Sequence, residues 1–336
     1  MRGFMKTKSA SNQFLILISV VLVCFFVLGI VGTIILSSVS GIGLKEMADP
    51  SKLDLTKPVY INMLRGMQAI QFVSLFVAPT FICTWLFSRE NKKYLGLKAP
   101  SHPGYIIAGV GVMLIAIPFT GWLGELNRNI PFPEGMASWM HEQEVDAART
   151  IQALLSRHTL SDLLLNLLCV AGFAAVGEEL LFRGMVQRLL IKMFKNPFIG
   201  ILVSAALFSA MHMQFYGFFP RLALGILLGL IYWYSGSLWV AMLAHFIYDA
   251  VLIILAYNNP SMLADESSLP MKNLILAGSI SFLFVILLLT WMRKKSVTSF
   301  ESVYAGDAVP VKNHPFDFDK NRSEERRVGK ECSLPC

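Results

Sequence analysis

Long apolar runs are the feature that most constrains how this chain can fold. Several stretches of about 20 residues contain no charged side chain, and about 20 apolar residues is the length with which an upright helix crosses a bilayer. Charged residues make up 15% of the 336 positions, whereas soluble domains carry roughly a quarter. The sequence therefore predicts an all-α, polytopic membrane protein rather than a soluble globule.

The apolar runs predict about eight transmembrane helices. Two glycines four residues apart, Gly225 and Gly229, form a small-xxx-small pair that lets one helix backbone approach another, and we expect it to serve packing alone. The expected helices cover residues 14–37, 66–88, 104–123, 160–192, 198–213, 221–235, 238–257 and 273–292.

These helices divide the chain into four regions. Residues 1–159 hold the N-terminal helices and an outward-facing, partly amphipathic connection over 124–159, which suits a substrate gate and a solvated loop equally. A helical core over 160–257 and a last transmembrane helix within 258–295 follow. Residues 296–336 are polar and are expected to form a disordered cytoplasmic tail. The last part of this tail differs in composition from the sequence before it, and we assign it no function.

The basic residues indicate how the protein is oriented. Lys and Arg number 29 against 22 Asp and Glu, but they lie in short clusters between apolar runs rather than on one soluble face, so we expect no nucleic-acid partner. Under the positive-inside rule such clusters mark cytoplasmic loops. We therefore expect both termini in the cytoplasm and the protein in the plasma (inner) membrane of a prokaryote. The clusters lie within residues 2–8, 89–98, 188–195 and 293–295.

A first group of ionisable residues interrupts the apolar pattern at residues 178–183. Such residues are costly inside a membrane and are therefore functional candidates. Glu179 and Arg183 are four residues apart with the acid first, which is the favourable order for a helical ion pair. That pair leaves Glu178 without a local partner and available to accept a proton.

Two groups that contain histidine follow on later helices. Phe208 precedes His212 by four residues, and His245 precedes Asp249 by four, so the Asp249 carboxylate can orient the imidazole of His245. At 1.5 Å per residue, Glu178 and His212 lie at similar depths on either side of one basic hairpin. We expect the three groups to converge in one intramembrane polar site.

The converging groups supply what hydrolysis of an amide by water requires. A carboxylate and an imidazole can polarise a water molecule, and a second polar pair can hold the tetrahedral oxyanion. No Ser or Cys is paired with a base, which disfavours a covalent intermediate. We expect no cofactor, and a Zn²⁺ ion held by Glu178, His212 and His245 is the alternative.

The ordered motifs resemble the signature of the CPBP family over about residues 160–255. That family comprises the type II CAAX prenyl endopeptidases of the Rce1 kind and related bacteriocin-processing and immunity proteins. The residues that carry the resemblance are Glu178-Glu179-x-x-x-Arg183, Phe208-x-x-x-His212 and His245-x-x-x-Asp249.

The resemblance implies a membrane-embedded endopeptidase of the glutamate type. Glu178 would be the general base, His212 its partner in activating water, and His245 part of the oxyanion hole. The prenyl endopeptidases have an Asn where this chain has Asp249, and because a carboxylate repels an oxyanion, we expect Asp249 to orient His245 instead. The implied partners are the lipid bilayer and a membrane-associated peptide or protein substrate. The residues expected to support the structure are Glu179, Arg183 and Phe208.

Two other functions compete with this hypothesis. A non-catalytic immunity or scaffolding protein of the same family would use the polar groups only to lock helices together. A transporter would use Glu178, His212 and Asp249 as a proton relay, although the sequence has no inverted repeat and no second polar cluster.

Overall fold

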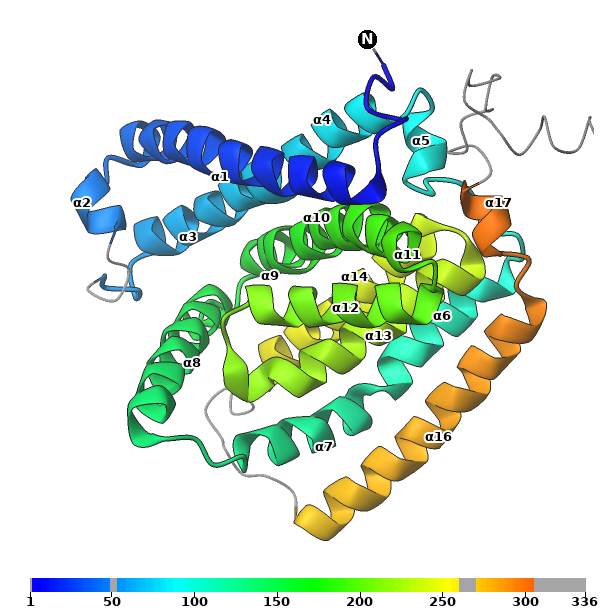
Figure 1. Cartoon of the computed structure of the whole chain (residues 1–336). Coiled ribbons are helices and arrows are strands. Elements are labelled where there is room, and N and C mark those ends of the chain that lie inside the picture. The colour runs from blue at the N-terminus through cyan, green and yellow to red at the C-terminus, as the bar shows by residue number, and fades with distance from the viewer. Residues whose placement is uncertain (1, 49–52, 260–269, 305–336) are drawn as a thin grey trace, which may run out of the picture.

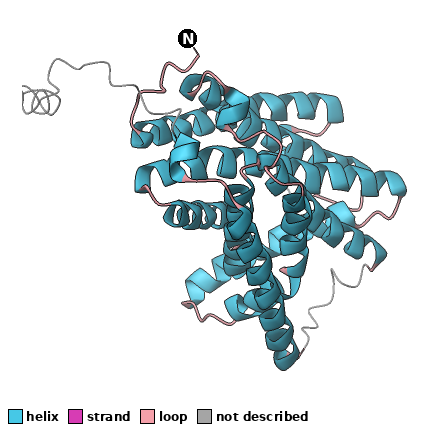
Figure 2. Ribbon diagram, turned by 90° about the vertical axis from the view of Figure 1, so that its right-hand side faces the viewer, coloured by secondary structure: helices cyan, strands magenta, loops and turns pink. Residues whose placement is uncertain are grey.

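The computed structural model describes residues 2–48, 53–259 and 270–304, and all of their regular structure is helical (Figures 1 and 2). Within this part of the chain, seven helical segments are long and apolar enough to span a membrane, and an eighth apolar helix is shorter. The predicted all-α, polytopic membrane fold is therefore confirmed. The segments are Ala10–Ser40, Pro58–Phe87, Gly104–Arg128, Leu160–Phe194, Phe215–Ser235, Leu238–Asn258 and Met271–Lys295, and the shorter helix is Pro197–Met211.

Capping residues explain where several helices begin and end. α1 starts after Ser9, whose hydroxyl accepts a hydrogen bond from the Asn12 amide, and it ends at Gly41 in the left-handed conformation (φ 71°). α12 starts at Pro197, after the Asn196 side chain accepts from two amides of the first turn. The single-helix elements are α1 (Ala10–Ser40), α2 (Leu44–Met47), α5 (Asn91–Tyr94), α8 (Glu134–Leu155), α12 (Pro197–Met211), α13 (Phe218–Ser235), α14 (Leu238–Asn258), α16 (Met271–Lys295) and α17 (Phe300–Tyr304).

Four spans are assembled from shorter helices joined end to end, and one of these consists of the 3-10 turn η5 (Phe215–Gly217) followed by α13. The segment that carries Glu178 and Glu179, α10, lies between two π-helical segments, η3 and η4. A π-helical turn is wider than an α-helical one and re-aims the side chains that follow it, and such turns are frequent at functional sites. The components are α3 (Pro58–Gln71), η2 (Phe72–Val77), α4 (Ala78–Phe87), α6 (Gly104–Ile115), α7 (Ile117–Arg128), α9 (Leu160–Asn166), η3 (Leu167–Gly172), α10 (Phe173–Leu181), η4 (Phe182–Gln187) and α11 (Arg188–Phe194).

The glycine pair on α13 lets two neighbouring helices approach closely. A Cβ on Gly225 would lie 2.9 Å from the Cβ of Ala205 on α12. The carbonyl oxygens of Gly225 and Gly229 accept hydrogen bonds from Arg183 and Gln187 of η4, at 3.0 and 3.2 Å. The pair therefore does more than the packing that the sequence predicts, because it also gives two buried polar side chains their acceptors.

Replacing Gly225 with Ala is expected to lower the free energy of unfolding by about 1–3 kcal/mol. The new Cβ would lie 3.1 Å from the Cα of Ala205, and a helix backbone cannot yield as a flexible side chain can. Gly121→Ala in α7 is the matched control, because nothing lies within 4 Å of its Cβ and Ala favours a helix. Thermal unfolding in detergent micelles measures both variants. Equal effects of the two substitutions would contradict the role of close approach.

Both described chain ends lie at one end of the bundle, together with the basic loop after α4 (Figure 1). The Gly3 amide donates to the carbonyl of Trp85 at 3.0 Å. Tyr304 of α17 is buried and donates to the carbonyl of Arg188 at 2.6 Å, and the Arg188 guanidinium lies 4.3 Å from the ring centre of Tyr94 in α5. The tail expected from residue 296 therefore begins with an ordered helix. Residues 305–336 lie outside the described residues.

Cysteine labelling is expected to place this end of the bundle in the cytoplasm, because its basic clusters follow the positive-inside rule. Lys92→Cys and Lys294→Cys, both at exposed positions, would be introduced one at a time into a cysteine-free background. Neither should react with an impermeant maleimide in intact cells, and both should react after permeabilisation. Labelling of either position from outside would reverse the orientation.

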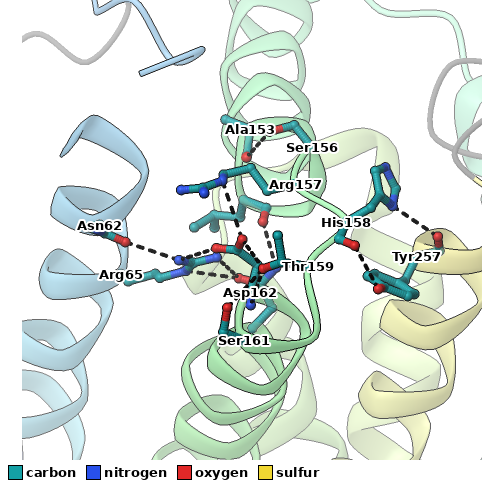
Figure 3. A network of polar contacts seen from close by, with 12 residues as sticks. Asn62, Arg65, Ala153, Ser156, Arg157, His158, Thr159, Ser161, Asp162 and Tyr257 are labelled. Carbon is teal, nitrogen blue, oxygen red and sulfur yellow. Dashed lines mark hydrogen bonds and ion pairs between the residues drawn. The ribbon is translucent and has the colours of Figure 1, made fainter. Parts of the chain in front are cut away.

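A buried polar network joins the first helices to the helical core (Figure 3). Arg65 of α3 forms a 3.0 Å ion pair with Asp162 of α9 and donates twice to the Asn166 amide oxygen. Arg157, in the link after α8, makes a second ion pair with Asp162 at 3.3 Å. The side chains of Arg65 and Asp162 are each 6% exposed. Because a buried charge is tolerated only when paired, the network holds α3, α8 and α9 in one arrangement.

Candidate active site

Glu178 of α10 lies between two imidazoles that come from different helices. Its Oε1 atom is 3.9 Å from Nε2 of His212, which follows α12, and its Oε2 atom is 3.9 Å from Nε2 of His245 on α14. The structure thus brings together the three residues that the sequence singles out. These separations exceed a direct hydrogen bond and suit a water molecule that bridges the carboxylate to an imidazole.

The backbone determines which nitrogen of His212 faces Glu178. Nδ1 lies 2.8 Å from the carbonyl oxygen of Phe208, and because a carbonyl can only accept, Nδ1 must carry the proton. In the neutral ring the Nε2 atom that faces Glu178 is therefore an acceptor. A water molecule between them would meet two acceptors, the Glu178 carboxylate and this nitrogen, one for each of its protons.

His245 is held by carboxylates at both ring nitrogens. Nδ1 lies 3.0 Å from Oε1 of Glu179, and Nε2 lies 3.3 Å from Oδ2 of Asp249. A carboxylate is an acceptor only, so this geometry fits an imidazolium that donates from both nitrogens. Asp249 contacts His245 as its spacing predicts. The contact with Glu179 is additional, since the sequence assigned that residue only to support of the helix.

The Glu179 and Arg183 side chains form the ion pair that their spacing predicts. The distance is 2.8 Å, and the two side chains are 0% and 2% exposed. The Arg183 guanidinium also lies 4.8 Å from the ring centre of Phe208. Because Glu179 contacts both Arg183 and His245 through Oε1, the ion pair fixes the position of the imidazole as well as that of the helix.

The polar residues open into a largely apolar cavity of about 660 Å³. This volume lies in the range of ordinary ligand sites. Ile151 and Leu155 of α8 contribute to its wall, so the connection expected over 124–159 contains a helix that reaches the candidate site. The polar motif residues that line the cavity are Glu178, His212, His245 and Asp249.

Residues 160–251 match the family described as "Type II CAAX prenyl endopeptidase Rce1-like". This segment is an Rce1-like domain. It contains all three motifs and ends just beyond Asp249.

A curated relative of the chain is an uncharacterized protein, YpbD of Bacillus subtilis (strain 168), which is 38% identical over 81 residues. The match covers 23% of this chain and 38% of the relative. No solved structure matches the chain.

The donor atoms of the Rce1-like domain do not form a metal cluster. Within the described residues, no group of three or more His, Cys, Asp or Glu is placed to hold a metal ion. The alternative zinc ligands are Glu178, His212 and His245. One carboxylate oxygen of Glu178 faces His212 and the other faces His245.

Two polar features around the Rce1-like domain were missed by the sequence reasoning. Arg65 and Asp162 stand at the ends of apolar runs, where a charge is unremarkable, and their 97-residue separation hides the ion pair. Arg221 lines the cavity, but no other charged residue stands within four positions of it to mark it as part of a motif. A search for charged residues in the first turn of each apolar helix would have found Asp162 and Arg221.

Proposed function

We propose that this integral membrane protein is an intramembrane endopeptidase of the glutamate type. It hydrolyses a peptide bond of a membrane-associated protein or peptide with water activated by Glu178 and His212. The observation that carries the proposal is the Glu178 carboxylate, which lies 3.9 Å from each of two imidazoles in a cavity among membrane-spanning helices. The match of residues 160–251 to the prenyl endopeptidase family supports the reaction class.

In this mechanism Glu178 is the general base. It removes a proton from the bridging water while Nε2 of His212 accepts a hydrogen bond from the other water proton, and the water oxygen attacks the carbonyl carbon. The resulting tetrahedral intermediate carries the negative charge on the former carbonyl oxygen. Glu178 then gives its proton to the leaving amine as the C–N bond breaks, which restores the carboxylate.

His245 stabilises the oxyanion in this scheme. Its imidazolium supplies positive charge beside Glu178, and a preorganised charge in a site that excludes bulk water is worth far more than one in solution. Asp249 and Glu179 act through His245, because each accepts from one ring nitrogen and neither needs to touch the substrate. Asp249 is thus a positioning residue.

The protein acts, on this proposal, in the plasma (inner) membrane of a prokaryote with both termini in the cytoplasm. The basic end formed by the α4–α5 loop and the described chain ends supports that orientation. A non-catalytic immunity or scaffolding role is the second candidate. The buried Glu179–Arg183 pair favours it, because such a pair would brace helices in an inactive relative as well.

Comparison of protein termini in two membranes tests the proposed function. One membrane contains the wild-type protein, and the other contains Glu178→Gln at the same abundance. New N-termini within or beside apolar segments are expected in the first and should be absent from the second. Identical sets of termini would favour the non-catalytic candidate.

Metal removal distinguishes the proposed mechanism from zinc catalysis. Because Glu178 serves as a free base, exhaustive chelation is expected to leave the hydrolysis rate of the purified protein unchanged, and elemental analysis should find no stoichiometric metal. If Glu178 were instead a zinc ligand, chelation would abolish activity and added Zn²⁺ would restore it. Such restoration would overturn the role of Glu178 but not the hydrolase function.

A further inference from the structure

One cationic side chain on the cavity wall has no role in the proposed hydrolysis. Among the described residues that line it, Arg221 is the single Lys or Arg. It lies in the first turn of α13, and His212 ends the antiparallel helix α12, so both lie near the same end of this helix pair. Arg221 therefore stands on the wall of the cavity that also presents the water-activating imidazole.

The Arg221 guanidinium has more N–H donors than it uses in hydrogen bonds within the described chain. Nη1 donates to the backbone carbonyl of Gln214 at 2.9 Å, and Nη2 donates to its side-chain oxygen, so both hydrogen bonds in the described chain go to a neutral residue. A guanidinium has five N–H donors, of which three remain. The carboxylates of Glu144 and Glu178 act on this guanidinium through space, but neither forms a hydrogen bond with it in the described chain, so its remaining N–H groups fit a ligand that brings an acceptor.

The surrounding chain is shaped to hold this guanidinium in place. A Cβ on Gly217 would lie 2.5 Å from Nη1 of Arg221, so a larger residue there would displace the guanidinium from this position. Asn127 of α7 fixes the same turn, because its amide nitrogen donates to the Phe215 carbonyl at 2.7 Å and its amide oxygen accepts from the Phe219 amide at 2.8 Å. The position of Arg221 is therefore set by two other elements of the fold.

We propose that Arg221 binds a carboxylate of the substrate and so decides which peptide bond reaches Glu178. The guanidinium fork matches a carboxylate in geometry as well as charge. The carboxylate is either the C-terminus of the substrate or an Asp or Glu side chain near the cleaved bond. Arg221 is on this proposal a specificity-determining residue, and the proposal rests on the proposed function.

The proposal is tested by measuring which peptides bind to a variant that cannot cleave them. Detergent-solubilised Glu178→Gln protein is incubated with pooled N-acetylated hexapeptides of randomised apolar sequence, and retained peptides are quantified by mass spectrometry. One pair of pools differs only in a free or amidated C-terminus. A second pair is amidated and carries either Glu or Gln at one position. The same pools are applied after Arg221→Gln is added.

One charged pool is expected to be retained about 10- to 100-fold better than its neutral partner, and Arg221→Gln should remove that preference. The pair of pools that shows it identifies the source of the carboxylate. Arg128→Gln, on the exposed part of α7, is the matched control and should retain the preference. Gly217→Ala is a second variant, which displaces the guanidinium while Arg221 remains, and it should act as Arg221→Gln does.

Equal retention within both pairs of pools, no retention of any pool, or a preference that survives both Arg221→Gln and Gly217→Ala would overturn the proposal. The assay measures peptide binding and involves no cleavage. A negative result would therefore overturn the role of Arg221 without contradicting the proposed hydrolysis. A preference that depends on Arg221, together with membrane termini that do not depend on Glu178, would mean an anion-binding site in a protein that is not a protease.

Discussion

Replacement of Glu178 by Gln is expected to lower kcat by about 10²- to 10⁴-fold, the usual contribution of a general base. The amide has nearly the shape of the carboxylate but cannot take a proton from water. Because the lost interaction arises in the transition state, KM should change much less than kcat. Hydrolysis of a client identified from membrane termini, measured with purified protein in detergent, gives both constants.

A measurement of folding shows whether the variant loses activity because the chemistry is impaired or because the protein is unfolded. Glu178→Gln should unfold at nearly the wild-type temperature, since the two contacts of the Glu178 carboxylate with imidazoles are each 3.9 Å long, which exceeds a direct hydrogen bond. Glu134→Gln, at an exposed position in the first turn of α8, is the matched control and should keep full activity. His212→Ala and His245→Ala should also abolish turnover. Activity that merely followed protein abundance in all three variants would support a structural role for the cluster.

Replacement of Arg183 by Ala is expected to lower the free energy of unfolding by about 3–5 kcal/mol, the usual cost of removing one partner of a buried ion pair. The substitution leaves the carboxylate of Glu179, which is 0% exposed, without its 2.8 Å partner. It also leaves the carbonyl of Gly225 without the 3.0 Å hydrogen bond from η4. Denaturant or thermal unfolding in detergent micelles measures the loss.

Two comparisons identify the cause of that instability. Arg128→Ala removes an ion pair to Glu125 whose Arg side chain is 61% exposed, and it should cost at most about 1 kcal/mol. Adding Glu179→Gln to Arg183→Ala should cost less than the same change in the wild type, because the carboxylate has then already lost one of its two cationic partners, Arg183, and retains only His245. Additive effects of the two substitutions would show that the ion pair is not the source of the stability.

Local patterns along the chain specify the membrane spans and the candidate residues. Helix formation and bilayer insertion depend on local composition, so the eight expected helices correspond to seven spans and the shorter α12. The spacing of four residues also predicts the pairs Glu179–Arg183 and His245–Asp249, because residues four apart share one helix face. Both kinds of prediction need only neighbours along the chain.

Contacts between residues far apart in sequence depend on how the helices pack against one another. The 3.0 Å contact of Glu179 with His245 and the ion pair of Arg65 with Asp162 join helices whose rotation no local pattern specifies. The π-helical segments beside α10 add to this, since each changes the direction in which the following side chains point. A sequence specifies which face of a helix is polar, whereas packing of large and small side chains determines what that face meets.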